Sequence, residues 1–166
     1  MTHERRSGTT YPEVLIGTGE DGKFAITNVP AGRIWLLYPK MSSLASRGIG
    51  ADVTPVETKD DGQEVDVGDI ELKRAYTFKG RVVLTDGKPI PPDMRVTLGA
   101  DQAWDSQIAP IAADGRFEFQ GVPPGIVSLS PAVKGYRPVE SSGVEALVKK
   151  GVSDFVIRME PAPARP

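Results

Sequence analysis

Apolar and polar residues alternate in short runs along the second half of the chain, a period of two that is typical of half-buried β-strands. The run from Thr77 to Leu84 places Phe78, Val82 and Leu84 on one face. Met94, Val96 and Leu98 repeat this pattern after a proline-rich turn. Together the runs predict about seven strands, at residues 77–84, 94–98, 107–111, around Phe117 and Phe119, around Val127 and Leu129, at 144–148 and at 154–159.

Glycine and proline separate these runs. The segment Asp86 to Pro92 holds three prolines, which cannot donate to a strand ladder, and Asp114-Gly115 is typical of a hairpin turn in which a positive φ angle is cheap. About seven short strands within about ninety residues predict an immunoglobulin-like β-sandwich.

One motif occurs twice. The run Asp21 to Gly32 (DGKFAITNVPAG) returns as Asp114 to Gly125 (DGRFEFQGVPPG), at an offset of 93 residues and without a gap. This spacing suits a small β domain and is too long for a solenoid repeat. The sequence therefore predicts two modules of the same kind.

The first module is predicted by aligning it with the second. Phe24 and Ile26 then face its core, as do Ile34 and Leu36, which turns Trp35 outward. A last strand is expected within residues 63–72, where Gly68 shifts the apolar alternation as a β-bulge would.

Only 20 residues precede Asp21, and their polar start is unlike a strand. One or two N-terminal strands are therefore missing from the first module, which leaves an open sheet edge. Upstream sequence, the neighbouring module or a second copy of the chain would complete it.

The predicted fold class is therefore all-β, with two tandem immunoglobulin-like or transthyretin-like β-sandwich modules. A partial sandwich is expected over residues 1–75, a complete one over 76–160, and a proline-rich tail over 161–166.

Composition removes several classes of function. The chain has 166 residues and a net charge of −2, with 20 basic and 22 acidic side chains interspersed, so neither nucleic acid nor direct membrane insertion is expected. It has no cysteine, and its N-terminus does not resemble a signal peptide. Either a cytoplasmic protein or a piece of a longer exported protein fits these features.

The repeated motif, with Gly80-Arg81-Val82-Val83 and Asp86-Gly87-Lys88-Pro89-Ile90 ahead of its second copy, resembles the carboxypeptidase regulatory-like domain. The resemblance covers Tyr76 to Glu160 well and Glu20 to Leu72 in part. It implies a transthyretin-like sandwich, classed with carbohydrate-binding-like folds, that serves as a non-catalytic accessory module in a longer extracytoplasmic protein. It carries over no catalytic residue, and a fold by itself does not specify a ligand.

No cofactor or metal is predicted. The one histidine, His3, lies in the N-terminal segment and is not part of a spaced zinc motif. Four Asp-Gly pairs begin at Asp21, Asp61, Asp86 and Asp114, and turn formation explains them better than calcium binding, because no dense run of acidic residues surrounds them.

Aromatic residues in polar loops are the best candidates for ligand contact. Trp104 lies in the loop from Gly99 to Ser106 beside Asp101, Gln102 and Asp105, where a sugar ring could stack on the indole. Packing of the Trp104 ring on the core or on a neighbouring module is the alternative. Tyr38 and Tyr136, at the ends of two strands, are interpreted as corner-type packing residues.

The sequence thus predicts a non-enzymatic accessory, structural or protein-interaction module of a longer extracytoplasmic protein. The alternative is a carbohydrate-binding module that uses Trp104. A protein partner or a glycan is the expected ligand, and self-association through the open edge of the first module is a further possibility.

Overall fold

The computed structural model describes residues 2–3, 16–100, 105–139, 144–148 and 152–163. Its described residues are nearly all β, which confirms the predicted fold class. They form two compact units, each built from two stretches of chain: residues 1–39 with 51–71, and residues 40–50 with 72–166. The sequence predicts one division, after residue 75, whereas the chain passes between these units three times.

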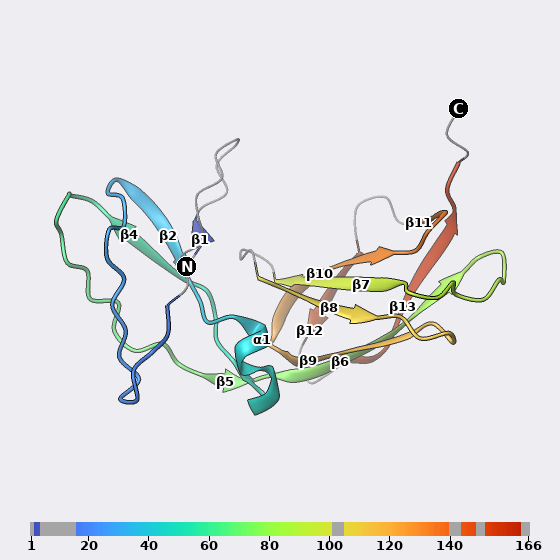
Figure 1. The fold of residues 1–166 in the computed structure, drawn as a ribbon, viewed down its shortest axis with the longest axis horizontal. Coiled ribbons are helices and arrows are strands. Elements are labelled where there is room, and N and C mark those ends of the chain that lie inside the picture. The colour runs from blue at the N-terminus through green and yellow to red at the C-terminus, as the bar shows by residue number, and fades with distance from the viewer. Residues whose placement is uncertain (1, 4–15, 101–104, 140–143, 149–151, 164–166) are drawn as a thin grey trace. The chain divides into compact units, whose positions relative to one another are not determined.

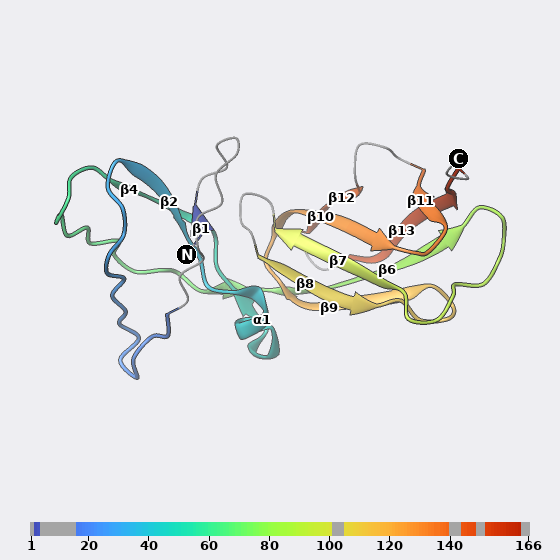
Figure 2. The same cartoon turned by 45° about the horizontal axis from the view of Figure 1, so that its top comes forward.

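The second unit is a sandwich of two four-stranded sheets, which lie in separate layers in Figure 1 and Figure 2. One sheet has the order β11-β13-β6-β9 and the other the order β12-β10-β7-β8. The only parallel pair within these two sheets joins β13 to β6. The strands are β6 (Tyr76–Leu84), β7 (Arg95–Ala100), β8 (Ser106–Pro110), β9 (Arg116–Val122), β10 (Gly125–Ala132), β11 (Tyr136–Pro138), β12 (Val144–Val148) and β13 (Val152–Pro161).

The core of the sandwich follows the predicted alternation. Phe78, Val82 and Leu84 of β6 are all buried, and Val96 and Leu98 of β7 face them from the other sheet with no exposed surface. The rings of Phe78 and Phe117 stack with their centroids 6.3 Å apart, and those of Phe117 and Phe119 meet edge to face at 5.9 Å. The predicted inward positions in this unit are therefore confirmed, because strand parity alone decides them.

The segment 40–50 belongs to the second unit although it precedes it by more than twenty residues. It contains helix α1 (Met41–Leu44), the 3-10 helix at Ala45–Arg47, and strand β3 (Ile49–Gly50), which pairs with β5 (Lys73–Arg74). Met41 is 3% exposed and joins the sandwich core, and α1 lies beside β8 and β9. No pattern in the sequence predicted this packing.

The first unit contains one three-stranded sheet of order β1-β2-β4 among its described residues. Its strands are β1 (Thr2–His3), β2 (Arg33–Leu37) and β4 (Thr54–Thr58). A small core of Trp35, Leu37 and Val56 is covered by half-buried apolar residues of two extended segments. These residues are Phe24, Ile26, Val29, Val65, Val67 and Ile70.

Three predictions for this unit are wrong. The segment of Phe24 and Ile26, which the alignment matches to the strand at Phe117 and Phe119, forms no strand, although both residues do face the core. Residues 63–72 form no strand either. A strand needs a ladder partner as well as an alternating pattern, and the described residues offer none here. Thr2 and His3, in contrast, pair with β2 although the polar N-terminus was expected to form no strand.

The face of β2 is also opposite to the prediction. Trp35 is 4% exposed and Leu37 is buried, whereas Ile34 is 40% exposed. The indole N–H of Trp35 donates to the Pro30 carbonyl at 3.1 Å and to Thr58 Oγ1 at 3.2 Å, so the ring can be buried with its polar atom satisfied. The prediction aligned Ile34 and Leu36 with Val127 and Leu129 of the second copy. This alignment gives the wrong parity because the backbones of the two copies differ at the glycine before each strand, Gly32 with φ +70° and Gly125 with φ +139°.

Candidate functional site

The predicted ligand loop is described at its two ends, residues 99–100 and 105–106. Asp101, Gln102 and Trp104 lie outside the described residues. Asp105 is 6% exposed, and its carboxylate accepts a hydrogen bond from the backbone N–H of Met41, the first residue of α1. The Asp105 carboxylate thus holds the segment 40–50, and glycan contact in this loop remains a prediction that rests on the other three residues.

The two candidate tyrosines differ in their surroundings. Tyr38 is 8% exposed. Tyr136 is half-buried, and its hydroxyl donates to Asp86 Oδ2 at 2.9 Å, while Lys88 Nζ lies 3.2 Å from the same oxygen. Desolvation works to raise the pKa of Asp86, but hydrogen bonds from Tyr136 and Lys88 outweigh it and lower that pKa. Desolvation and the hydrogen bond to Asp86 raise the pKa of Tyr136.

In three of the Asp-Gly pairs, the aspartate side chain accepts a hydrogen bond from a backbone amide of the same turn. Asp21, Asp86 and Asp114 each accept a hydrogen bond from the amide two residues later, at 3.1, 3.3 and 3.1 Å. The part of the chain that the structure describes contains no group of three His, Cys, Asp or Glu residues arranged to hold a metal ion. Side-chain to backbone bonding of this kind is what makes Asp common in turns.

The outer faces of the two sheets differ in charge. On the β12-β10-β7-β8 sheet, the described outward side chains of β10, β7 and β8 are uncharged except for Arg95, and Ile108 and Ile126 are 64% and 49% exposed. We call this surface the uncharged face. Its residues are Arg95, Thr97, Gly99, Ser106, Ile108, Pro110, Ile126, Ser128, Ser130 and Ala132.

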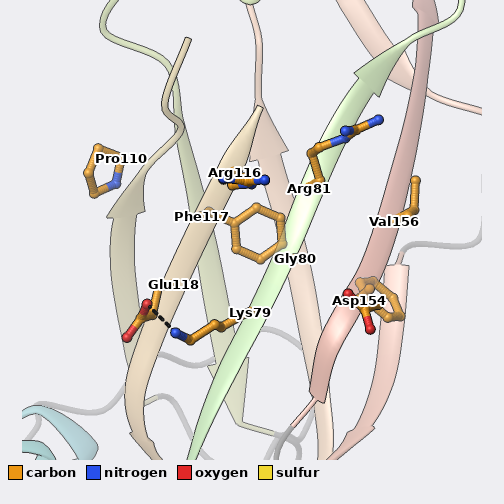
Figure 3. A pocket seen from close by; sticks show the side chains of 10 residues that line it. Lys79, Gly80, Arg81, Pro110, Arg116, Phe117, Glu118, Asp154 and Val156 are labelled. Carbon is orange, nitrogen blue, oxygen red and sulfur yellow. Dashed lines mark ion pairs between the residues drawn. The ribbon is translucent and has the colours of Figure 1, made fainter. Parts of the chain in front are cut away.

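The outer face of the β11-β13-β6-β9 sheet, here called the charged face, carries charges of both signs. Lys79 Nζ lies 3.0 Å from Glu118 Oε2, and Arg137 Nη2 lies 2.6 Å from Glu160 Oε1. A groove of about 770 Å³ is lined mainly by residues of this sheet and reaches Pro110, at the end of the edge strand β8 of the other sheet. Figure 3 shows its lining, which is Lys79, Gly80, Arg81, Pro110, Arg116, Phe117, Glu118, Asp154, Phe155 and Val156.

Two backbone features lie at the base of this groove. Gly80 occupies an inward position of β6, where a Cβ atom would lie 2.5 Å from Phe117 Cζ and 2.7 Å from the Phe155 carbonyl. Opposite it the register of β13 shifts between Val152 and Phe155, which is a bulge that re-aims the intervening residues. The glycine makes room for the Phe117 ring beneath the sheet, and the bulge in β13 lies directly beside it.

Sequence reasoning placed Arg81, Arg116 and Ile108 correctly on strands or at strand starts but gave them no role. Outward positions follow from parity, so their exposure could have been inferred. Which outward residues become neighbours depends on strand order and register, and a single sequence does not specify these.

Comparison with known proteins gives fold-level resemblances only. No family model matches the chain, and no curated protein matches it. The Bacillus anthracis TIE protein is similar over 57% of this chain and 19% of its own, with 15% identity and a TM-score of 0.41. The minor pilin GBS52 of Streptococcus agalactiae (14% identity, TM-score 0.39) and a point mutant of the shaft pilin SpaA from Lactobacillus rhamnosus GG (11%, 0.38) each cover 90% of this chain and 68% of their own.

The chain thus spans about a fifth of the TIE protein and about two thirds of each pilin. In the described part of the chain, no helix has both the length and the apolar character that a membrane span requires.

Proposed function

We propose that the chain is a non-catalytic structural and protein-interaction module of a longer extracytoplasmic protein, of the carboxypeptidase regulatory-like type. The observation that carries this proposal is the uncharged face. Ile108 is 64% exposed on the edge strand β8, with Thr97 opposite it on β7 and Arg95 and Gly99 at the diagonal positions. A sheet face with small side chains and almost no charge can approach another protein closely at little desolvation cost.

The partner that fits this face is a protein surface that is itself apolar and weakly charged. Packing it against the sheet would cover Ile108 of β8 and Ile126 of β10, which lie apart on the face as its two exposed isoleucines. Among the described residues, the charged face exposes Val156, and Val139 is also exposed directly after β11. Most of its other exposed side chains are polar or charged, so the two faces can be compared within one unit.

Site-specific photo-crosslinking in the cells that make the protein tests this function. A photoreactive phenylalanine analogue at position 108 is expected to give an adduct with one protein, and the same analogue at position 158, on the charged face, is the control. The adduct should disappear when Ile126→Asp is added. Equal adducts from both positions, or none from position 108, would reject the uncharged face as the contact surface.

Self-association is a separate proposal for the first unit. Strand β4 ends the sheet order β1-β2-β4, and an exposed strand edge can pair with a second chain. Pro55 removes one donor from that strand, which weakens the edge as a template. Sedimentation of the isolated chain tests the idea, and a monomer at micromolar concentration would exclude it.

Glycan binding around Trp104 is the other function that the sequence predicted. Calorimetry of the chain against soluble polysaccharides, repeated with Trp104→Ala, tests it directly. Saturable heat that is lost in the variant would support a carbohydrate-binding module, and no heat with any polysaccharide would remove this alternative.

A further inference from the structure

The groove on the charged face is lined by a pair of arginines at the same ladder position. Arg81 of β6 and Arg116 of β9 are register partners in the antiparallel pair, so their Cβ atoms lie within about 4.5–5.5 Å of each other. Both side chains are exposed and carry the same charge. Like charges directly across a ladder destabilise it, so this pairing is unfavourable in the free protein.

The neighbouring row on the same two strands shows the usual arrangement. Lys79 and Glu118, two residues away along each strand, are also register partners and form an ion pair at 3.0 Å. Both rows line the groove, and one of them pairs opposite charges while the other pairs two cations. Figure 3 shows both rows beside Gly80.

The two guanidinium groups are not equally engaged. Arg116 Nε lies 3.5 Å from Asp114 Oδ2, whereas no ion pair to Arg81 is found within the described residues. The stem of Arg81 passes over Gly115, since a Cβ atom at that glycine would lie 3.1 Å from Arg81 Cγ. The stem of Arg81 therefore lies against the turn, and the residue forms part of the lining of the groove.

We propose that this groove binds an oxyanion, a carboxylate or phosphate group, between Arg81 and Arg116. An arginine fork donates two parallel hydrogen bonds to such a group, and two forks from adjacent strands can hold it from both sides. Val156 is the register partner of Arg81 on β13 and is 51% exposed, so an apolar surface lies beside the anion position. The volume of about 770 Å³ accommodates a ligand larger than the anion alone.

The charge balance of the groove supports an anion over a cation. Its acidic lining residues are Glu118, which is paired with Lys79, and Asp154, which also has an interaction partner. A bound anion would remove the repulsion between the two arginines, so binding and strand pairing would favour each other.

Titration of the full chain, followed by backbone amide resonances, tests the site. Inorganic phosphate and glutarate are the two probes, and chloride holds the ionic strength constant. Saturable shifts are expected at residues 79–81, 116–118 and 154–156. The probe with the lower dissociation constant identifies the preferred oxyanion.

The matched variants are Arg81→Gln and Arg158→Gln, which remove the same charge from the same face. Loss of the Arg81 fork is expected to weaken binding by about tenfold or more, because a charge-assisted hydrogen bond contributes on that scale. Arg158→Gln, outside the groove, should leave binding within about twofold. Arg81→Lys should give an intermediate value, since it keeps the charge and loses the fork.

Arg81→Gln removes one of two cations that repel each other, so the midpoint of thermal unfolding should stay the same or rise. Weaker binding in this variant would then not be due to unfolding. If Arg81→Gln does unfold, Arg116→Gln replaces it with the same expected weakening. Shifts that are equal in Arg81→Gln and the parent chain, or that chloride alone reproduces, would overturn the proposal. Neither outcome depends on the uncharged face or its partner.

Discussion

The two copies of the repeated motif have the same turns and different surroundings. Gly22 and Gly115, at matched positions, have φ angles of +80° and +86°. In each copy the preceding aspartate, Asp21 or Asp114, accepts a hydrogen bond at 3.1 Å from the amide two residues later. The turn chemistry of the motif is therefore local, because the residues of the motif itself satisfy it.

A second shared conformation lies seven residues beyond the start of each motif. Asn28 has φ +60° and Gly121 has φ +67°, so both are left-handed. Asparagine is one of the few residues with a side chain that adopt this region readily, which explains how the two copies can differ in residue and agree in backbone. Beyond this point the copies diverge, with φ +70° at Gly32 and +139° at Gly125.

The apolar residues between these turns differ in what they pack against. Phe117 and Phe119 lie on strand β9, paired with β6, and are 4% and 2% exposed. Phe24 and Ile26 occupy the matched positions in a segment without a ladder and are half-buried. An identical pattern thus becomes a strand in one unit and an extended covering segment in the other, because strand formation depends on the partner as well as on the residues.

The largest expected difference between the copies is in core packing. Phe117→Ala should lower the free energy of unfolding by about 3–5 kcal/mol, because it leaves a cavity in a closed sandwich. Phe24→Ala removes a half-buried ring and should lower it by ~1–2 kcal/mol. Urea denaturation of both variants measures the two losses. Equal losses would show that the two segments are equally packed.

Alanine substitutions at the matched positions Gly22 and Gly115 distinguish the cost of the left-handed backbone from the cost of steric overlap. Gly22→Ala should cost ~1–2 kcal/mol for the left-handed conformation alone, since nothing lies within 4 Å of the added Cβ position. Gly115→Ala should cost about 2–4 kcal/mol, because the added Cβ would also overlap the Val82 carbonyl. Thermal unfolding distinguishes them, and a Gly22→Ala effect as large as that of Gly115→Ala would contradict the role of crowding.

Exchanging the residue types at the two matched left-handed positions, Asn28 and Gly121, tests whether the segment 40–50 packs closely on the second copy. A Cβ atom at Gly121 would overlap Ala45 in the segment 40–50, whereas Asn28 is exposed. Gly121→Asn keeps a residue that tolerates the conformation, so its expected cost of about 1–3 kcal/mol comes from overpacking. Asn28→Gly should change the free energy of unfolding by less than about 0.5 kcal/mol.

Hydrogen exchange locates the Gly121→Asn effect. Amides of residues 41–50 should exchange faster in this variant, while those of β6 keep their protection. Faster exchange throughout the sandwich would instead indicate that Gly121 supports the whole unit.

The sequence predicted the sandwich well because its strands are bounded by strong turn residues and alternate cleanly. Phe78, Val96 and Phe117 were assigned inward and are buried. The burial of Trp35 was missed because the alignment of copies was carried past Gly32, where their backbones separate. Parity errors of this kind reverse a whole strand at once.

The candidate sites were less predictable for a different reason. Asp105 looked like a loop residue open to a ligand, and its partner proved to be the Met41 amide, 64 residues earlier in the chain. The Arg81 and Arg116 pair likewise needs the register between β6 and β9. Both contacts join positions that no local pattern connects, so they follow from tertiary structure only.

The smallest expected effect concerns an ion pair that exists in the second copy alone. The hydrogen bond from Lys79, with a weaker one from Gln120, lowers the pKa of Glu118 below its usual value. In the first copy, Ala25 occupies the position that matches Glu118, so no such pair can form there. A lowered folded pKa means that the stabilisation is present above the unfolded pKa and is lost as the pH falls through the folded value. The loss should be slight because both side chains are exposed.

Carboxyl resonances followed through an acid titration measure this pKa. Lys79→Gln should move the pKa of Glu118 upward, because it removes the donor that favours the ionised carboxylate. Lys88→Gln removes the same charge from a side chain that pairs with Asp86 and should leave Glu118 unchanged. A shift of Glu118 in both variants would mean that net charge, rather than the cross-strand contact, sets its pKa. The second copy would then differ from the first in packing alone.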